Sequence, residues 1–102
     1  MTDDDRPRRV QLSRKKGWRM PANTVSVARP TGYGNRFHVG LPANPTAADC
    51  VRRFREEQVA EYEGAPLERL RGKNLACWCP LDQPCHADVL LEFANREPHH
   101  DR

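Results

Sequence analysis

The sequence lacks long apolar runs. None approaches the roughly 20 residues of a membrane-spanning helix, and the N-terminus has no apolar core of a signal peptide. Hydrophobic residues make up 37% of the 102 residues and charged residues 30%. This balance is polar for a globular protein but too apolar for a disordered one. We therefore expect a cytoplasmic protein without a membrane partner.

Cysteine is confined to a few positions. The sequence holds four cysteines, and three of them, Cys77, Cys79 and Cys85, lie close together. Structural disulfides are rare in a reducing compartment, so this clustering favours metal binding or thiol chemistry. Cys50 lies apart, on the apolar face of a predicted helix, and is expected to be a small core residue.

The length is that of a single domain with one modest core. Residues 1–8 include an acidic run, residues 96–102 are polar, and neither end has apolar residues to anchor it. We predict disordered tails at both ends and one α/β domain over residues 9–95.

Alternating apolar and polar residues predict short strands over residues 10–13 and 24–28. A third strand is predicted over residues 73–79, and residues 36–40 are expected to form a brief extended segment. Because helical segments separate these strands, the fold class is predicted to be α/β. We expect a small single-domain sandwich with a short, partly parallel sheet of three to four strands and about three helices.

The first predicted helix begins at Thr46 and ends near Gly64. Thr46 and Asp49 match a capping box, in which a hydroxyl and a carboxylate bind the free backbone amides of the first turn. A short helix over residues 66–71 and a last helix over residues 85–95 complete the prediction.

The Cys77-Trp78-Cys79 segment ends the third predicted strand, and Cys85-His86 starts the last helix. Alternate residues of a strand point the same way, so Cys77 and Cys79 share a face. We expect Cys79, Cys85 and His86 to converge at this turn, with Cys77 deeper along the strand.

Three interpretations of this cluster stay open. Cys77, Cys79, Cys85 and His86 form a set of ligands suited to zinc, which is the candidate cofactor. Alternatively, the positive end of the helix stabilises a thiolate or an anion, with Cys79 or Cys85 as nucleophile and His86 as acid or base. In the third, Cys77 packs in the core and the other residues cap the helix.

A second loop follows the strand over residues 24–28. Ligands of open α/β sheets bind beyond the carboxyl ends of parallel strands, so this loop is expected to line the same crevice. Arg29 offers a forked cation, Asn35 an amide, Gly34 a close backbone approach and Tyr33 a stacking surface. These groups predict binding of a nucleotide-like or phosphate-bearing ligand.

Basic residues crowd the N-terminal part of the chain around Trp18. Such a stretch is suited to the phosphates of nucleic acid, although short basic runs are more often simply solvated. Its cations are Arg6, Arg8, Arg9, Arg14, Lys15, Lys16 and Arg19.

Three motifs, at residues 27–37, 70–79 and 84–90, resemble domain of unknown function 4326, a family found in bacteria and phages. The resemblance covers about residues 10–95 and departs from the family pattern at Gly32-Tyr33 and Arg36. It implies one domain and a shared set of motifs, but no activity.

Two functions therefore stay open. The first is a small enzyme or binding protein whose Cys/His pocket takes a nucleotide-like ligand. The second is a non-catalytic nucleic-acid-binding module stabilised by zinc.

Overall fold

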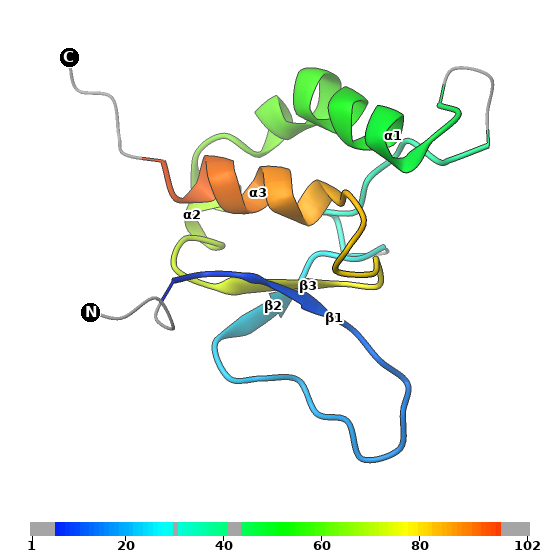
Figure 1. Cartoon of the computed structure of the whole chain (residues 1–102). Helices are drawn as coiled ribbons and strands as arrows, with labels where there is room; N and C mark the ends of the chain where they lie inside the picture. The colour runs from blue at the N-terminus through cyan, green and yellow to red at the C-terminus, as the bar shows by residue number, and fades with distance from the viewer. Residues whose placement is uncertain (1–5, 30, 41–43, 97–102) are drawn as a thin grey trace.

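Three short strands form a single sheet in the computed structural model, which describes residues 6–29, 31–40 and 44–96 (Figure 1). The strands are β1 (Arg9–Gln11), β2 (Thr24–Ser26) and β3 (Asn74–Cys77). Their order is β1-β3-β2, and both pairings are parallel. The predicted α/β fold is confirmed, and the carboxyl ends of all three strands lie at one edge of the sheet.

Sheet hydrogen bonds extend beyond the strands at both ends. Val27 N–H donates to the Ala76 carbonyl over 2.8 Å, and Leu12 N–H donates to the Cys77 carbonyl over 2.9 Å. At the other end, Leu75 N–H donates to the carbonyl of Arg8, within the predicted N-terminal tail. Residues 1–5 and 97–102 of the two predicted tails lie outside the described residues.

A helical segment begins at Thr46 with the predicted capping box, since Thr46 and Asp49 bind each other's backbone amides. It runs as α1 (Ala47–Arg53), a π-helical turn η2 (Phe54–Gln58) and a 3₁₀ turn η3 (Val59–Tyr62). The predicted single helix thus changes pitch twice along its length before Gly64.

Two more helices complete the fold. A short α2 (Ala65–Glu68) precedes β3, and α3 (His86–Ala94) follows the turn after β3. Figure 1 shows α3 lying over the sheet, α1 beyond α3, and the connection from β1 to β2 on the opposite side of the sheet. Large, fully buried apolar side chains lie between these layers and include Val27, Phe54, Leu70, Leu75 and Leu90.

Residues 36–40 differ from the predicted brief extended segment, because they begin in a bend and end in a turn. Their backbone bonds to side chains: Phe37 N–H donates to Asn35 and Arg36 N–H to Gln58. None of the helices in the described part of the chain has the length and apolar character needed to cross a membrane.

Candidate metal centre and adjoining pocket

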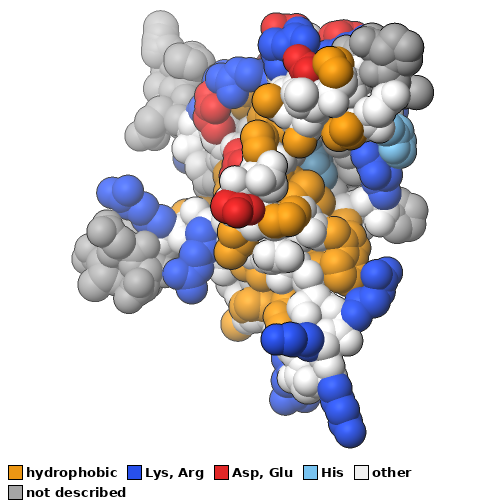
Figure 2. Space-filling model, turned by 45° about the vertical axis from the view of Figure 1, so that its right-hand side comes forward, with side chains coloured by type: hydrophobic (Ala, Val, Ile, Leu, Met, Phe, Trp, Pro, Cys, Tyr) orange, Lys and Arg blue, Asp and Glu red, His pale blue; other side chains and the backbone are white. Residues whose placement is uncertain are grey.

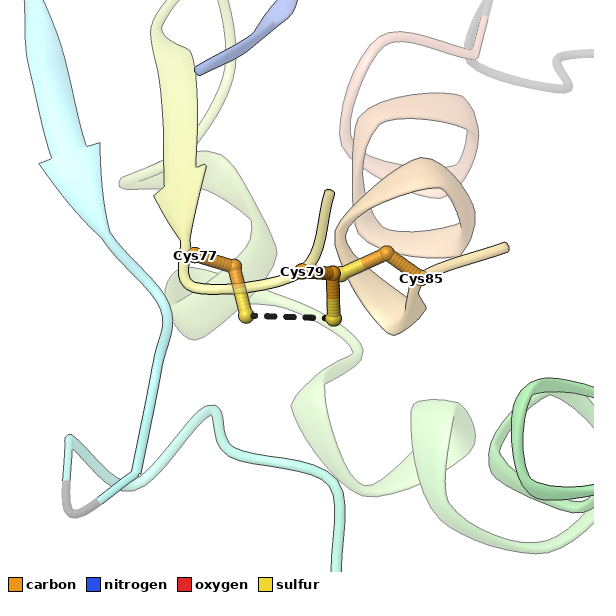
Figure 3. A group of neighbouring side chains, drawn as sticks. All are labelled: Cys77, Cys79 and Cys85. Atoms are coloured by element: carbon orange, nitrogen blue, oxygen red, sulfur yellow. Dashed lines mark hydrogen bonds between the residues drawn. The ribbon is translucent and has the colours of Figure 1, made fainter. Parts of the chain in front are cut away.

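Three cysteine sulfurs gather at the carboxyl edge of the sheet (Figure 3). Cys77 is the last residue of β3, Cys79 lies in the turn that follows, and Cys85 is the N-cap of α3. All three Sγ atoms lie within 4.8 Å of one another. Three of the four predicted metal ligands therefore lie together, and Cys77, at the end of β3, stands in the group where the predicted trio had His86.

The spacing of the sulfurs fits a metal ion. Two thiolates at the usual Zn–S distance of about 2.3 Å and a tetrahedral angle lie roughly 3.8 Å apart. The Sγ atoms of Cys77 and Cys79 are 3.8 Å apart. Two of the three cysteines are buried and Cys79 is half-buried, so an ion would contact solvent only from one side.

The protonation of the cluster also suits a cation. Hydrogen bonds from Cys79 and Cys85 lower the pKa of the Cys77 thiol in spite of its burial. Hydrogen bonding to Cys77 in turn raises the pKa of Cys79 and Cys85. Hydrogen bonding among the three sulfurs therefore favours the thiolate form of Cys77, and a metal ion would displace the protons that remain on the cluster.

His86, the fourth predicted metal ligand, lies outside the group of atoms within 4.8 Å of one another. Its Nε2 is 2.8 Å from the Val27 carbonyl oxygen, which can only accept, so Nε2 carries the proton. Nδ1 is then an acceptor, 3.7 Å from the Cys85 sulfur. Burial lowers the pKa of His86, so the ring is neutral beside Cys85.

A cavity of about 380 Å³ opens beside the cluster. All three cluster cysteines and His86 line it, together with the predicted ligand residues Arg29 and Asn35. Cys50 is buried, as predicted, and also lines this cavity. The apolar wall of the cavity consists of Phe37 and Val39, of Ala47 and Val51 on α1, and of Trp78.

The loop after β2 fixes the Arg29 side chain. Arg29 Nε donates to the carbonyl of Asn35 over 2.8 Å, and the buried Asn35 side chain donates to the Cys50 carbonyl over 3.1 Å. A Cβ on Gly34 would lie 2.7 Å from Arg29 Cγ and 3.0 Å from Arg29 Cα, so glycine permits this close approach. The loop thus holds an exposed guanidinium at the mouth of the cavity.

Tyr33 and Gly34, the other two predicted ligand residues, do not line the cavity beside the cysteine cluster. The Tyr33 hydroxyl donates to the Pro66 carbonyl, and its ring packs against Tyr62 with centroids 5.3 Å apart. Gly34 lines a second cavity of about 390 Å³ on the other side of Arg29. Among the predicted ligand residues, Arg29 and Asn35 therefore lie together with the cysteine cluster, whereas Tyr33 and Gly34 support the loop that carries them.

The structural roles of two residues, Arg9 and Gln58, were not predicted from the sequence. Arg9 belongs to the basic stretch, but its side chain is only 8% exposed and binds Asp88 and the carbonyls of Pro80, Leu81 and Gln83. It holds the turn between Cys79 and Cys85.

Gln58 is 1% exposed and bonds the backbone of Gly34 and Arg36. A polar residue on the apolar face of a predicted helix is the signal that could have identified Gln58.

Fold and site together define a small parallel α/β domain with a three-cysteine cluster at the carboxyl edge of its sheet. Over residues 10–96 the chain matches the family described as Domain of unknown function (DUF4326), and it belongs to that family. Neither the curated proteins nor the solved structures include a match.

Proposed function

We propose that this domain binds a zinc ion through Cys77, Cys79 and Cys85, and that the fourth coordination position faces the adjoining cavity. A phosphate-bearing, nucleotide-like ligand binds in that cavity against Arg29. The observation that carries this proposal is the juxtaposition of three sulfurs within 4.8 Å of one another with a cavity that Arg29 also lines.

The donor set favours zinc. Thiolates are soft ligands that select zinc over magnesium or calcium, and structural zinc sites are usually closed by four protein ligands. Here the structure brings together three sulfurs, whereas the Nδ1 of His86, 3.7 Å from the Cys85 sulfur, lies outside the group of atoms within 4.8 Å of one another. Three protein ligands and an open position are the arrangement of zinc sites that bind water or a substrate.

The cavity favours a ligand with an apolar ring and an anionic group. Its volume of about 380 Å³ lies in the range of small-molecule sites, and its wall is mostly apolar with few polar groups. Arg29 is held at Nε, which leaves the two terminal amino groups of its guanidinium for a phosphate. A mononucleotide combines both features.

Metal content tests the first part of the proposal. We expect about one zinc per chain in freshly purified, reduced protein, and loss of that zinc in Cys79→Ser. Cys50→Ser is the matched control, because Cys50 lines the same cavity outside the cluster and should keep its zinc. Zinc-free wild-type protein, or equal loss in both variants, would reject the metal centre.

Nucleotide titration tests the second part. AMP should bind more tightly than adenosine, and Arg29→Gln should abolish the difference, as followed by the NMR signal of the Trp78 indole N–H. Arg36→Gln is the control, since Arg36 lies outside this cavity and pairs with Glu61. Equal affinity of the wild-type domain for AMP and adenosine would contradict an anion site at Arg29.

Thiol chemistry is the second candidate function, supported by the contact between Cys85 and the neutral His86 ring. In this reading Cys79 or Cys85 of the zinc-free cluster acts as the nucleophile, with His86 as its acid or base. The two candidates separate in one measurement, because bound zinc would protect the cluster from alkylation by iodoacetamide. Rapid alkylation of Cys79 in protein as purified would favour thiol chemistry and count against a resident ion.

A further inference from the structure

The connection between β1 and β2, residues 12–23, is a strongly basic projection. It extends from the sheet on the side opposite the helices (Figure 1), and it contains no Asp or Glu. Figure 2 shows the same projection at the bottom of the molecule, with Lys and Arg side chains around it. Its exposed cations are Arg14, Lys15, Lys16 and Arg19.

These cations differ from those of the helices. On α1 and η2, Arg52, Arg53 and Arg55 all form ion pairs with Asp or Glu side chains. The four cations of the projection form no ion pair with any residue in the described part of the chain. The charges of these three helical arginines are therefore neutralised locally, whereas the projection carries positive charge that no acidic side chain of the described residues pairs with.

The projection also touches the rim of the cavity. The guanidinium carbon of Arg14 lies 4.4 Å from the centroid of the Trp78 ring. Trp78 is 42% exposed, lies between Cys77 and Cys79, and lines the cavity. The basic surface thus continues into an exposed aromatic ring. Proteins that bind single-stranded nucleic acid combine these two features, basic side chains for the phosphates and aromatic rings for the bases.

We propose that this surface binds single-stranded nucleic acid, with phosphates along residues 14–19 and unpaired bases at Trp78. Each Lys or Arg that pairs with a phosphate releases counterions from the nucleic acid. The exposed indole offers a stacking surface to an unpaired base, whereas the bases of a duplex are already stacked on one another. An anionic membrane fits less well, because Met20 is the one large apolar side chain of the projection that is exposed. The proposal does not depend on an ion at the cysteine cluster.

Fluorescence anisotropy with fluorescein-labelled 20-nucleotide thymidine and uridine oligomers tests it. We expect both oligomers to bind, more tightly than a duplex of equal length. Lys15→Gln/Lys16→Gln should weaken binding about tenfold and reduce the slope of log K against log salt by about 1.4. Trp78→Leu should weaken binding by roughly 5- to 160-fold, the cost of losing one stacked base.

The matched control is Arg52→Gln/Arg69→Gln, which removes the same charge from α1 and the end of α2. It should change oligomer affinity less than about twofold. Equal weakening by the two double variants, equal or tighter binding of the duplex, or binding of phosphatidylserine vesicles but not oligomers would overturn the proposal. Zinc content is measured in every variant, so loss of the metal centre is distinguished from loss of the nucleic-acid surface.

Discussion

Single residues hold the two loops of the site in place. Arg9 lies on β1, yet its guanidinium binds Asp88 and three carbonyls of the turn between Cys79 and Cys85. An arginine offers five donors in a fixed fork, so one side chain can hold several carbonyls at once. The geometry of the cysteine cluster therefore depends on a residue far away in the sequence.

Replacing Arg9 should weaken metal binding. We expect Arg9→Gln to lower zinc affinity by about tenfold, as residues that orient metal ligands generally do. Competition with a chromophoric chelator measures this change. Arg8→Gln, at an exposed neighbouring position, is the control, and an unchanged affinity in folded Arg9→Gln would show that the turn holds its shape without the clamp.

Replacing Gly34 should also disturb the site, because a larger residue does not fit beside Arg29. The added Cβ of Gly34→Ala would meet the side chain and backbone of Arg29, so the loop must shift. We expect a loss of about 1–3 kcal/mol in the free energy of unfolding, measured in urea, together with weaker AMP binding.

A double-mutant cycle with Arg29→Ala tests the cause, since the smaller side chain removes the closest of the clashing atoms. The double variant should lose less stability than the sum of the single variants. Strict additivity would show that the cost of Gly34→Ala arises elsewhere.

At the scale of elements, ion pairs join η2 to α3. Both terminal nitrogens of Arg55 lie 2.7 Å from Glu92 oxygens, and Arg96 adds a second partner over 3.0 Å. These hydrogen bonds, from Arg55 first and Arg96 second, lower the pKa of Glu92 to about 2. All three side chains are partly exposed, so solvent screening keeps their contribution to stability small.

This bridge predicts a pH dependence of stability. Because the pKa of Glu92 is lower in the folded chain, its stabilisation is present above the ordinary value of 4.5 and is lost as the pH falls towards 2. Glu92→Gln should therefore be less stable than wild type at pH 7, and the difference should shrink in this acidic window. Urea unfolding at several pH values measures the difference.

Glu63→Gln serves as the control, because Glu63 forms no ion pair with a described residue. A pH-independent difference between Glu92→Gln and wild type would contradict the assigned role of the bridge.

At the scale of the whole molecule, the sequence predicted local features better than it predicted contacts between distant residues. Residue alternation located β1 and β2, and the Thr46 capping box located the start of α1, because both signals are local. The parallel pairing of β2 and β3 brings the Arg29 loop and the cysteine turn to one edge, as expected for loops that follow the carboxyl ends of parallel strands.

Local sequence patterns did not predict where β3 ends or which groups the polar side chains bind. The predicted strand ran to Cys79, but it stops at Cys77, so Cys79 lies in the turn with its sulfur 3.8 Å from that of Cys77. Arg9 and Tyr33 looked like ligand-facing groups, yet their partners are carbonyls distant in sequence. Such contacts depend on tertiary packing, which a single sequence does not encode in short patterns.

The most direct test of the three-thiolate centre is X-ray absorption spectroscopy at the zinc edge of the purified, reduced protein. The structure predicts three sulfur ligands at about 2.3 Å and one oxygen or nitrogen at about 2.0–2.1 Å, without the outer-shell scattering of imidazole. Addition of AMP should change the light-atom ligand and leave the sulfurs in place. Four sulfurs, or three sulfurs with an imidazole, would contradict the open position, and a spectrum without sulfur would contradict the metal centre itself.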